Sequence, residues 1–354
     1  MNHAVILAGG VGERFWPAST PERPKQLLPL ISDRTMVRET ADRLEGLIPP
    51  ERWLVLTGAA IAGRIAAELP EMPRDHVIGE PEPKNTAAAI GLAAGLLAAR
   101  DPDAILLVLP ADHAIGNPKA FRATVEEGLQ LAAEEPVIVL FGVVPDRPET
   151  GYGYVRRGDP IRARSVEAFE VASFEEKPDA PTARALVQDG LHTWNSGLFC
   201  GRAKVFLEEY AEHLPLMRRT IDSAVVAWSA DPRAALEGFY AAVEATSIDY
   251  GIMQQTDRAV VMPAAKWDWD DVGSWEALAR WIEPDADGNV VVGDVVLEEC
   301  RNVIAWCPTG RLSALGIEDC VIVQSGEETL VVPRDRLDDL KPFVRSIGDG
   351  RARR

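Results

Sequence analysis

The sequence has 354 residues, of which 47% are hydrophobic, and its formal net charge is −18. This length is typical of one large domain with a smaller one, and the hydrophobic fraction is sufficient for a sizeable core. The acidic balance disfavours non-specific binding to nucleic acids, although local cations can still bind an anionic substrate. No apolar run reaches the roughly 18 uncharged residues of a membrane-spanning helix, and no basic leader precedes the first predicted strand. We therefore expect neither a membrane segment nor a signal peptide.

The cysteine pattern indicates a reducing environment. The four cysteines are Cys200, Cys300, Cys307 and Cys320, and none of them forms a CxxC pair. We therefore expect neither a zinc site nor a disulfide framework. The cysteines are instead expected to be the reduced thiols of a cytoplasmic protein. The basic sequence at residues 351–354 is expected to be a frayed tail rather than a binding patch.

The first predicted strand is a short apolar run at residues 4–7, and a glycine-rich loop follows it. The glycines of this loop are Gly9, Gly10 and Gly12. Glycines past a strand end let the backbone turn sharply and approach a ligand, and their N–H groups can line an anion-binding concavity. Arg14 and Lys25 add two cations, and four prolines keep the segment from becoming one continuous helix. Such a loop is suited to a nucleoside triphosphate.

Two common phosphate-binding motifs do not match this loop. The P-loop string GxxxxGK[ST] does not occur, and the dinucleotide string GxGxxG fails because Phe15 stands where its third glycine belongs. An ordinary turn between a strand and a helix explains Gly9 and Gly10 alone equally well. The choice between these interpretations therefore depends on motifs elsewhere in the chain.

Strand-like apolar runs alternate with helical patterns as far as residue 145, which predicts a mostly parallel sheet with helices on both faces. The expected strands are residues 54–57, 105–109 and 137–144, and the expected helices are residues 36–47, 59–69, 86–99 and 120–133. Ligands of such sheets bind beyond the carboxyl ends of the strands. The glycine loop and Asp112 both follow a strand end, so they can converge.

The remainder of the chain changes character twice. Residues 151–155 and 166–174 predict a β excursion, and helical patterns follow at residues 181–188, 204–213, 216–245 and 275–282. Residues 284–289 are rich in turn formers and predict a linker. Short β-rich runs then recur at uneven intervals, which predicts a small all-β unit with an open number of coils and a closing helix at residues 335–344. We expect this unit to serve packing or a homodimer contact rather than an effector site.

Two aspartate-bearing strings are candidates for a metal site. Asp112 follows the predicted strand at residues 105–109, and Asp270 and Asp271 lie in the string WDDVGSW. Mg²⁺ takes few carboxylates and prefers phosphate and water for its other ligands. A lone aspartate at a strand end is more often a helix cap or a turn former, which is the alternative for Asp112. Adjacent residues of a strand face opposite ways, so only one of Asp270 and Asp271 should point inward.

Several strings, in the same order along residues 3–280, resemble the sugar-1-phosphate nucleotidyltransferases. They are LAGGxGxRFxP with PK from residue 7, PADH from residue 110, ETGYGY from residue 149, EKP from residue 176, WNSGLF from residue 194 and WDDVGSW from residue 269. The details FWPAS, PKQ and SIDY resemble the mannose-1-phosphate guanylyltransferase branch. The loop EPEPKNTA from residue 80 departs from the family pattern, which usually has Arg in place of Lys84 and Pro in place of Ala88.

The resemblance implies roles for individual residues. The catalytic residues are Arg14, Lys25, Asp112 and Asp271, of which Asp112 and Asp271 hold Mg²⁺. The nucleotide-binding residues are Leu7, Ala8, Gly9, Gly10, Gly12, Glu80, Asn85 and Thr86, with Glu80 as the acceptor for the N1–H and amino donors of guanine. The sugar-phosphate-binding residues are Gly151, Glu175, Lys177 and Asn195. Simpler alternatives are a helix N-cap for Asn85 or Thr86, and a surface turn for Lys177.

By the same resemblance, an α/β nucleotidyltransferase domain at residues 1–283 precedes a small, left-handed β-helix-like domain at residues 284–354. The implied reaction joins GTP and mannose 1-phosphate into GDP-mannose and pyrophosphate. Its nucleophile is a phosphate oxygen that is already anionic near neutral pH, so no general base is required. Because 354 residues leave no room for a second enzyme domain, we expect no fused isomerase.

Two alternatives to this function remain open. One is another base or sugar specificity in the same fold, such as glucose 1-phosphate, and the strings FWP and SIDY favour mannose over it. The other is a catalytically silent, nucleotide-sensing regulatory subunit. The presence of Arg14, Lys25, Asp112 and Asp271 argues against it, because a silent relative would tolerate the loss of any of them.

Overall fold

The structure is a computed structural model that describes residues 1–161, 166–264 and 266–348, so the basic tail at residues 351–354 lies outside the described residues. Two compact units share the chain, and each is assembled from segments that are distant in sequence. Unit 1 consists of Met1–Gly9, Thr40–Ala111 and Ile115–Trp269. Unit 2 consists of Gly10–Glu39, Asp112–Ala114 and Asp270–Arg354. The chain therefore leaves unit 1 directly after Gly9 and returns to it twice.

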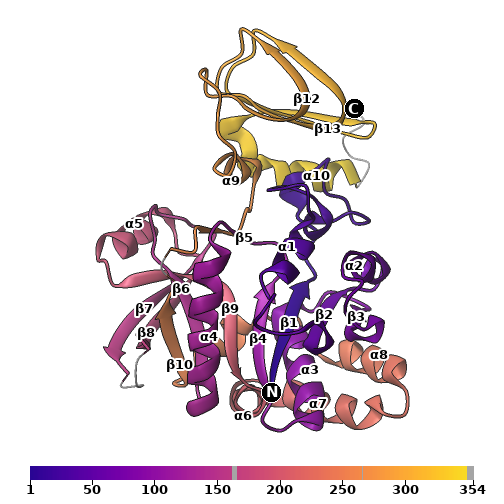
Figure 1. The fold of residues 1–354 in the computed structure, drawn as a ribbon, viewed down its shortest axis with the longest axis vertical. Helices are drawn as coiled ribbons and strands as arrows, with labels where there is room; N and C mark the ends of the chain where they lie inside the picture. The colour runs from indigo at the N-terminus through magenta and orange to yellow at the C-terminus, as the bar shows by residue number, and fades with distance from the viewer. Residues whose placement is uncertain (162–165, 265, 349–354) are drawn as a thin grey trace. The chain divides into compact units, whose positions relative to one another are not determined.

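Unit 1 is built on a nine-stranded sheet in the described part of the chain (Figure 1). Its strands, in order across the sheet, are β3 (Val77–Glu80), β2 (Trp53–Gly58), β1 (Asn2–Ala8), β4 (Ile105–Pro110), β9 (His192–Arg202), β6 (Ile138–Val143), β10 (Ala259–Pro263), β8 (Phe169–Glu176) and β7 (Gly153–Pro160). All of them except β8 and β9 run in one direction. The sheet is therefore an α/β sheet of mostly one strand direction, with two antiparallel insertions.

Helices cover both faces of this sheet. They are α2 (Ala62–Glu68), α3 (Asn85–Arg100), α4 (Pro118–Glu134), α5 (Ala180–Gln188), α6 (Ala203–His213), α7 (Pro215–Trp228) and α8 (Pro232–Ala242), with short helical turns η3 (Pro50–Arg52), η4 (Arg74–His76) and η5 (Asp249–Met253). Phe141 and Cys200 face Gly128 of α4, where an added side chain would lie 2.6 Å from the Phe141 ring. Their strand neighbours Leu140 and Phe199 face the other way and join a core that includes residues of α3, α6 and α7.

Some elements of unit 1 differ from the sequence expectations. The helical region expected at residues 216–245 is two helices, because Asp231 caps α8 by accepting hydrogen bonds from the N–H groups of Arg233 and Ala234 at 3.0 Å each. Pro232 then occupies the first turn of α8, where its missing N–H costs nothing. Strands β3, β9 and β10 were not expected as strands at all. No helix in the described ranges is long and apolar enough to cross a membrane.

Unit 2 contains a four-stranded sheet in the part of the chain that the structure describes. The strands of this sheet are β12 (Val290–Glu298), β13 (Ile304–Leu315), β14 (Cys320–Ser325) and β15 (Glu328–Pro333). The helices and helical turns of unit 2 are η1 (Glu13–Phe15), η2 (Lys25–Leu27), α9 (Trp275–Ala279), η6 (Arg334–Asp339) and α10 (Leu340–Gly348). Strands β12, β13 and β14 pair in parallel, and β15 pairs with β14 in antiparallel fashion. The expected all-β unit is therefore present. The β-rich runs expected at residues 290–292 and 295–297 form the single strand β12, and β15 was not expected. Helix α1 (Met36–Asp42) and strands β5 (Ala114–Ile115) and β11 (Trp269–Asp270) each include a point where the chain passes from one unit to the other.

The core of unit 2 joins the glycine-loop segment to the C-terminal sheet. The rings of Phe15 and Trp275 meet edge to face with centroids 4.9 Å apart, and the rings of Trp275 and Trp306 lie 5.6 Å apart. Leu28 and Leu340 belong to the same buried cluster. The compact units therefore do not follow the boundary expected after residue 283, because apolar side chains from before it pack against the strands that come after it.

Candidate functional site

The glycine loop is held against Lys25 by its backbone. Gly12 has a φ of 74°, in the left-handed region that favours glycine, and a side chain there would lie 2.5 Å from Cβ of Lys25. The Lys25 N–H donates to the carbonyl oxygen of Val11 at 3.2 Å. The hydroxyl of Ser19 donates to the Gly12 carbonyl oxygen at 2.6 Å. The loop thus places Lys25 next to Gly12, as the close spacing of glycine and cation suggested.

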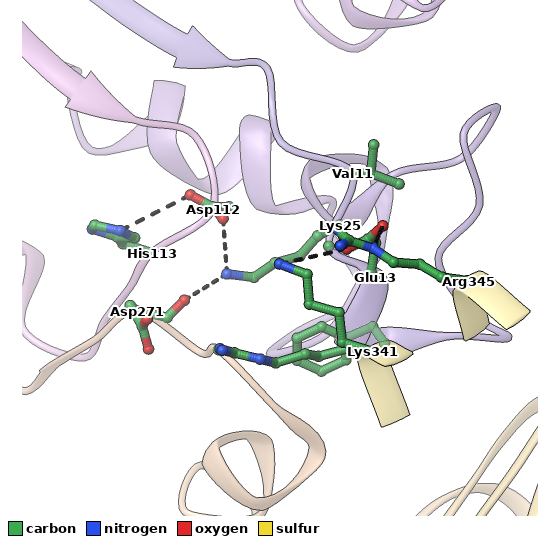
Figure 2. A pocket seen from close by; sticks show the side chains of 12 residues that line it. Val11, Glu13, Lys25, Asp112, His113, Asp271, Lys341 and Arg345 are labelled. Atoms are coloured by element: carbon green, nitrogen blue, oxygen red, sulfur yellow. Dashed lines mark hydrogen bonds and ion pairs between the residues drawn. The ribbon is translucent and has the colours of Figure 1, made fainter. Parts of the chain in front are cut away.

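Lys25 connects the two aspartate-bearing strings of unit 2. Its ammonium donates to Oδ2 of Asp112 at 2.9 Å and to the carbonyl oxygen of Asp271 at 2.5 Å (Figure 2). Lys25 is only 4% exposed, so these are contacts of a buried cation. Burial acts to raise the pKa of Asp112, but the charges of Lys25 and His113 and the hydrogen bond from Lys25 outweigh it, so the pKa lies below its ordinary value. Asp112 is therefore a carboxylate at neutral pH.

Asp270 and Asp271 point to different surroundings, as strand alternation predicts. Asp270 is 4% exposed and accepts hydrogen bonds from Arg280 Nε at 3.0 Å and from the Val272 N–H at 2.7 Å. Val272 has a φ of 47°, which is costly for a β-branched residue and marks a sharp turn at this point. A side chain on Gly273 would lie 3.0 Å from Oδ2 of Asp271. The turn therefore leaves room for the Asp271 carboxylate, while Asp270 is a structural residue.

A cavity of about 490 Å³ in unit 2 gathers all four residues expected to be catalytic. It is lined by Val11, Gly12, Glu13, Arg14, Phe15, Lys25, Asp112, His113, Asp271, Gly273, Lys341 and Arg345. The lining contains more lysine and arginine than aspartate and glutamate, and Arg14 is exposed in it. An excess of cations in a concave site is suited to a polyphosphate, even on a chain whose overall charge is strongly negative.

The donor set of this cavity fits a divalent ion that is bound together with a phosphate. Two carboxylates, those of Asp112 and Asp271, line the same cavity. Among the described residues, no group of three or more His, Cys, Asp or Glu side chains could hold a metal. Mg²⁺ commonly uses one or two protein carboxylates and completes its shell with water and phosphate oxygens. The residues present therefore suit such an ion better than a closed, all-protein metal site.

In unit 1, Glu80 lies where strand β3 ends, close to the start of the glycine loop. Its Oε2 lies 3.4 Å from the place that a side chain on Gly9 would take, and its Oε1 accepts a hydrogen bond from the Tyr240 hydroxyl at 2.6 Å. Burial raises the pKa of Glu80, and the hydrogen bond from Tyr240 opposes this rise. Leu7 and Ala8 form the last residues of β1. Glu80 is thus held in place by Tyr240 with one oxygen facing Gly9.

Asn85 and Thr86 do not cap α3 through their side chains, contrary to the simpler interpretation of the sequence. Lys84 precedes the helix, and Asn85 is already its first residue with a φ of 66°. The Asn85 side chain accepts a hydrogen bond from the Thr86 N–H at 2.8 Å. Thr86 Oγ1 accepts one from the Ile248 N–H at 2.9 Å. The helix start is therefore tied to the SIDY string, which the sequence did not link to it.

Four polar residues of unit 1 form a second cluster, which contains two of the residues expected to bind the sugar phosphate. Asn195 Nδ2 donates to Oδ1 of Asp249 at 2.9 Å, and Lys177 Nζ donates to Oε1 of Glu176 at 2.5 Å. Glu176 also raises the pKa of Asp249 by its charge, so the two pairs are electrostatically coupled. Glu175 precedes Glu176 in β8 and is exposed, as is Gly151. Glu176, rather than Glu175, is therefore the carboxylate of β8 that pairs with Lys177 and acts on Asp249.

The half-buried carboxyl of Asp249 is predicted to lower the stability of the fold at neutral pH. Burial, with the charge of Glu176, raises its pKa from 3.8 to about 6. The folded state therefore binds more protons than the unfolded state between these values, and stability is lost as the pH rises through this window. Asp249→Asn is expected to raise the melting temperature by about 2 °C or more near neutral pH and by much less at about pH 4. Thermal melts of this variant and of the exposed control Glu175→Gln test the prediction, and an equal shift at both pH values would contradict it.

The cavity also has members that the sequence did not single out. Lys341 and Arg345 come from α10, in a part of the chain where no residue was assigned a chemical role. Glu13 lies inside the loop string at a position that the family signature leaves undefined. The spacing of Lys341 and Arg345 places both on one face of a helix, but nothing in the sequence indicates what that face meets.

Comparisons with known proteins agree with the fold and with the motif strings. The nucleotidyl transferase family model matches residues 3–287. The mannose-1-phosphate guanylyltransferase ManC of Salmonella typhimurium is 41% identical over 359 residues, which cover 99% of this chain and 74% of that protein. The mannose-1-phosphate guanylyltransferase of Escherichia coli K12 is 39% identical over 360 residues, with the same coverage of 99% and 74%.

A solved structure shows the same fold along nearly the whole chain. It is a crystal structure of a protein from Thermus thermophilus, described as a mannose-1-phosphate geranyltransferase, with a TM-score of 0.86 and 34% identity. The match covers 98% of this chain and 99% of that one. The chain therefore belongs to the nucleotidyl transferase family, in the group of the mannose-1-phosphate guanylyltransferases.

Proposed function

We propose that the chain transfers the guanylyl group of GTP to mannose 1-phosphate, giving GDP-mannose and pyrophosphate. The main support is that relatives named for this activity are 41% and 39% identical across 99% of the chain. The cavity of unit 2 adds to it, because Arg14, Lys25, Asp112 and Asp271 line one space. A nucleotide-sensing subunit without activity would not need all four.

The proposed chemistry is alignment and charge neutralisation rather than proton transfer. The attacking phosphate oxygen of mannose 1-phosphate is already anionic, so no side chain has to act as a general base. Arg14 and Lys25 would neutralise charge that develops on the phosphates of the nucleotide. Asp112 and Asp271 would hold a divalent ion, proposed to be Mg²⁺, which supplies further positive charge and orients the phosphates. For this chemistry the side chains only have to be held in fixed positions. The hydrogen bonds of Lys25 to Asp112 and to the Asp271 carbonyl oxygen help to hold them there.

The remaining assignments are proposals of the same kind. Nucleotide contacts are assigned to Leu7, Ala8, Gly9, Gly10, Gly12, Glu80, Asn85 and Thr86, as the resemblance of the motif strings implies. Glu80 would accept hydrogen bonds from guanine, since one of its oxygens is already positioned by Tyr240. Gly151, Lys177 and Asn195 would contact the sugar phosphate, with Glu176 in the role first expected of Glu175.

Four further expectations also belong to this proposal. The parallel pairing of β12, β13 and β14 supports a short, left-handed β-helix-like domain. The family match ends at residue 287, near the proposed boundary between a catalytic domain at residues 1–283 and this domain at residues 284–354, although the compact units interleave across that boundary. A homodimer and a cytoplasmic location stay predictions from the sequence.

Substrate choice is the direct test. Among the nucleoside triphosphates and sugar 1-phosphates, GTP with mannose 1-phosphate is expected to give the highest kcat/KM, because the motif details and the named relatives agree on this pair. Pyrophosphate release measured with each triphosphate against a panel of sugar 1-phosphates decides it. Faster turnover of UTP or dTTP with glucose 1-phosphate would overturn the specificity and leave the fold assignment intact. No turnover with any pair would favour the regulatory alternative.

A further inference from the structure

Helix α10 contributes two cations to the cavity that the C-terminal unit was not expected to supply. Arg345 donates through Nε and Nη2 to the two carboxylate oxygens of Glu13 at 3.1 and 3.0 Å. Lys341 Nζ lies 3.6 Å from Oε2 of the same carboxylate. Figure 2 shows Lys341 and Arg345 reaching from α10 toward Glu13. Arg345 thus meets the carboxylate of Glu13, which lies 332 positions earlier in the sequence.

The position of these cations is fixed by packing of the helix. Leu340 is 2% exposed and belongs to the core cluster that contains Phe15. The ring of Phe343 meets the ring of Trp16 edge to face, with centroids 6.4 Å apart. Lys341 and Arg345 lie one helical turn apart, so they share one face of α10. The helix is therefore anchored to the loop segment through apolar contacts, while its cationic face is turned to the cavity.

Glu13 is paired with both of these cations. Its hydrogen bonds with Arg345 lower its pKa, and the charges of Arg345 and Lys341 act in the same direction, so it is ionised. The side chains of Lys341 and Arg345 are 46% and 62% exposed, which leaves them accessible from solvent. A guanidinium binds phosphate oxygens in the same paired geometry that it uses with a carboxylate. The oxygens of a phosphate thus suit these two cations in the same way as the oxygens of Glu13.

We propose that Lys341 and Arg345 bind the terminal phosphates of the nucleoside triphosphate, and hence the pyrophosphate product, by exchanging Glu13 for phosphate oxygens. This proposal rests on the proposed function for the identity of the ligand. Arg14 and Lys25 line the same cavity as the two α10 cations, so a chain of phosphates could be neutralised along its length. The C-terminal unit thereby takes part in binding the leaving group, in addition to packing.

Binding of inorganic pyrophosphate to the full chain tests this without turnover. Isothermal titration in the presence of Mg²⁺ is expected to give an affinity about tenfold weaker for Arg345→Ala and for Lys341→Ala than for the parent. Glu13→Gln is expected to bind pyrophosphate a few-fold more tightly, because the competing carboxylate is gone. Arg336→Ala is the matched control, since Arg336 pairs with Asp339 and does not line the cavity. Its affinity is expected to equal that of the parent.

The opposite signs for Glu13 and Arg345 separate ligand binding from a structural role. Both substitutions remove the same ion pair, so a purely structural role would weaken binding in both and lower both melting temperatures equally. That result, or pyrophosphate affinity unchanged in Arg345→Ala, would overturn the inference. In steady-state assays, the α10 variants are expected to raise KM for GTP and leave KM for mannose 1-phosphate unchanged. A parent enzyme that binds pyrophosphate but turns over another substrate pair would overturn the proposed specificity and not this inference.

Discussion

Asp112→Asn and Asp271→Asn are each expected to lower turnover by roughly 10³-fold. Asparagine keeps the size of the side chain and one oxygen, but it removes the negative charge that binds a divalent ion. Among the described residues that line the cavity, Glu13 is the only other carboxylate besides Asp112 and Asp271. Both variants are expected to fold, because Asp112 and Asp271 are only partly buried. Steady-state rates across a series of Mg²⁺ concentrations, with melting temperatures for each variant, check the expectation.

The double variant tests whether the two carboxylates share one ion. If they do, the losses are non-additive, and the double variant is little slower than the slower single one. Additive losses would instead mean that Asp112 and Asp271 act on separate ions or separate steps. Asp270→Asn serves as the comparison at the neighbouring residue, although this substitution is expected to affect stability. Because Asp270 is buried and paired with Arg280, its substitution is expected to lower the melting temperature. Asp271→Asn is expected to lower the rate without this loss of stability.

Lys25→Ala is expected to lower turnover by roughly 10²-fold or more. The structure adds a second effect, since this ammonium is buried and also donates to Asp112 and to the Asp271 carbonyl oxygen. The substitution removes a cation from the phosphates and leaves a partly buried carboxylate without its partner, so the melting temperature should fall as well. Turnover, pyrophosphate affinity and thermal melts of the variant check both effects.

An exposed lysine supplies the control for this variant. Lys204 is 73% exposed and pairs loosely with Glu208 at 3.8 Å, so Lys204→Ala should leave rate and stability unchanged. If Lys25→Ala lowers the melting temperature but costs less than about tenfold in rate, then Lys25 only joins the two aspartate strings. Its proposed contact with the phosphates would then be wrong.

The sequence predicted elements best where the hydrophobic pattern was strong and local. The buried strands β1, β2, β4 and β6 were expected within a few residues of their bounds. Strand β9 was missed because His192–Arg202 mixes polar residues and glycine, and it becomes a strand by pairing with β4, β6 and β7. That pairing is a property of the assembled sheet, which a local pattern cannot contain.

The candidate site shows the same division between local and long-range information. Strand alternation predicted that only one of Asp270 and Asp271 points inward, and the family resemblance assigned that role to Asp271. Of these two residues, only Asp271 lines the cavity. The same rule was not applied to Glu175 and Glu176, and there the structure turns Glu176 toward Lys177. Lys341 and Arg345 could not be assigned at all, because their relation to Glu13 depends on how α10 packs. Resemblance to a family identifies residues within its motifs, and these two lie beyond the last of those motifs.

The interleaved composition of unit 2 also has a consequence for how the protein is made. A nascent chain exposes the segment Gly10–Glu39 early, but the partners of Phe15 in the same core, Trp275 and Trp306, are translated last. Strands β1, β2 and β4 can pair long before then, whereas the segment Gly10–Glu39 still lacks the C-terminal part of its core. The phosphate cavity is therefore completed only after α10 has left the ribosome.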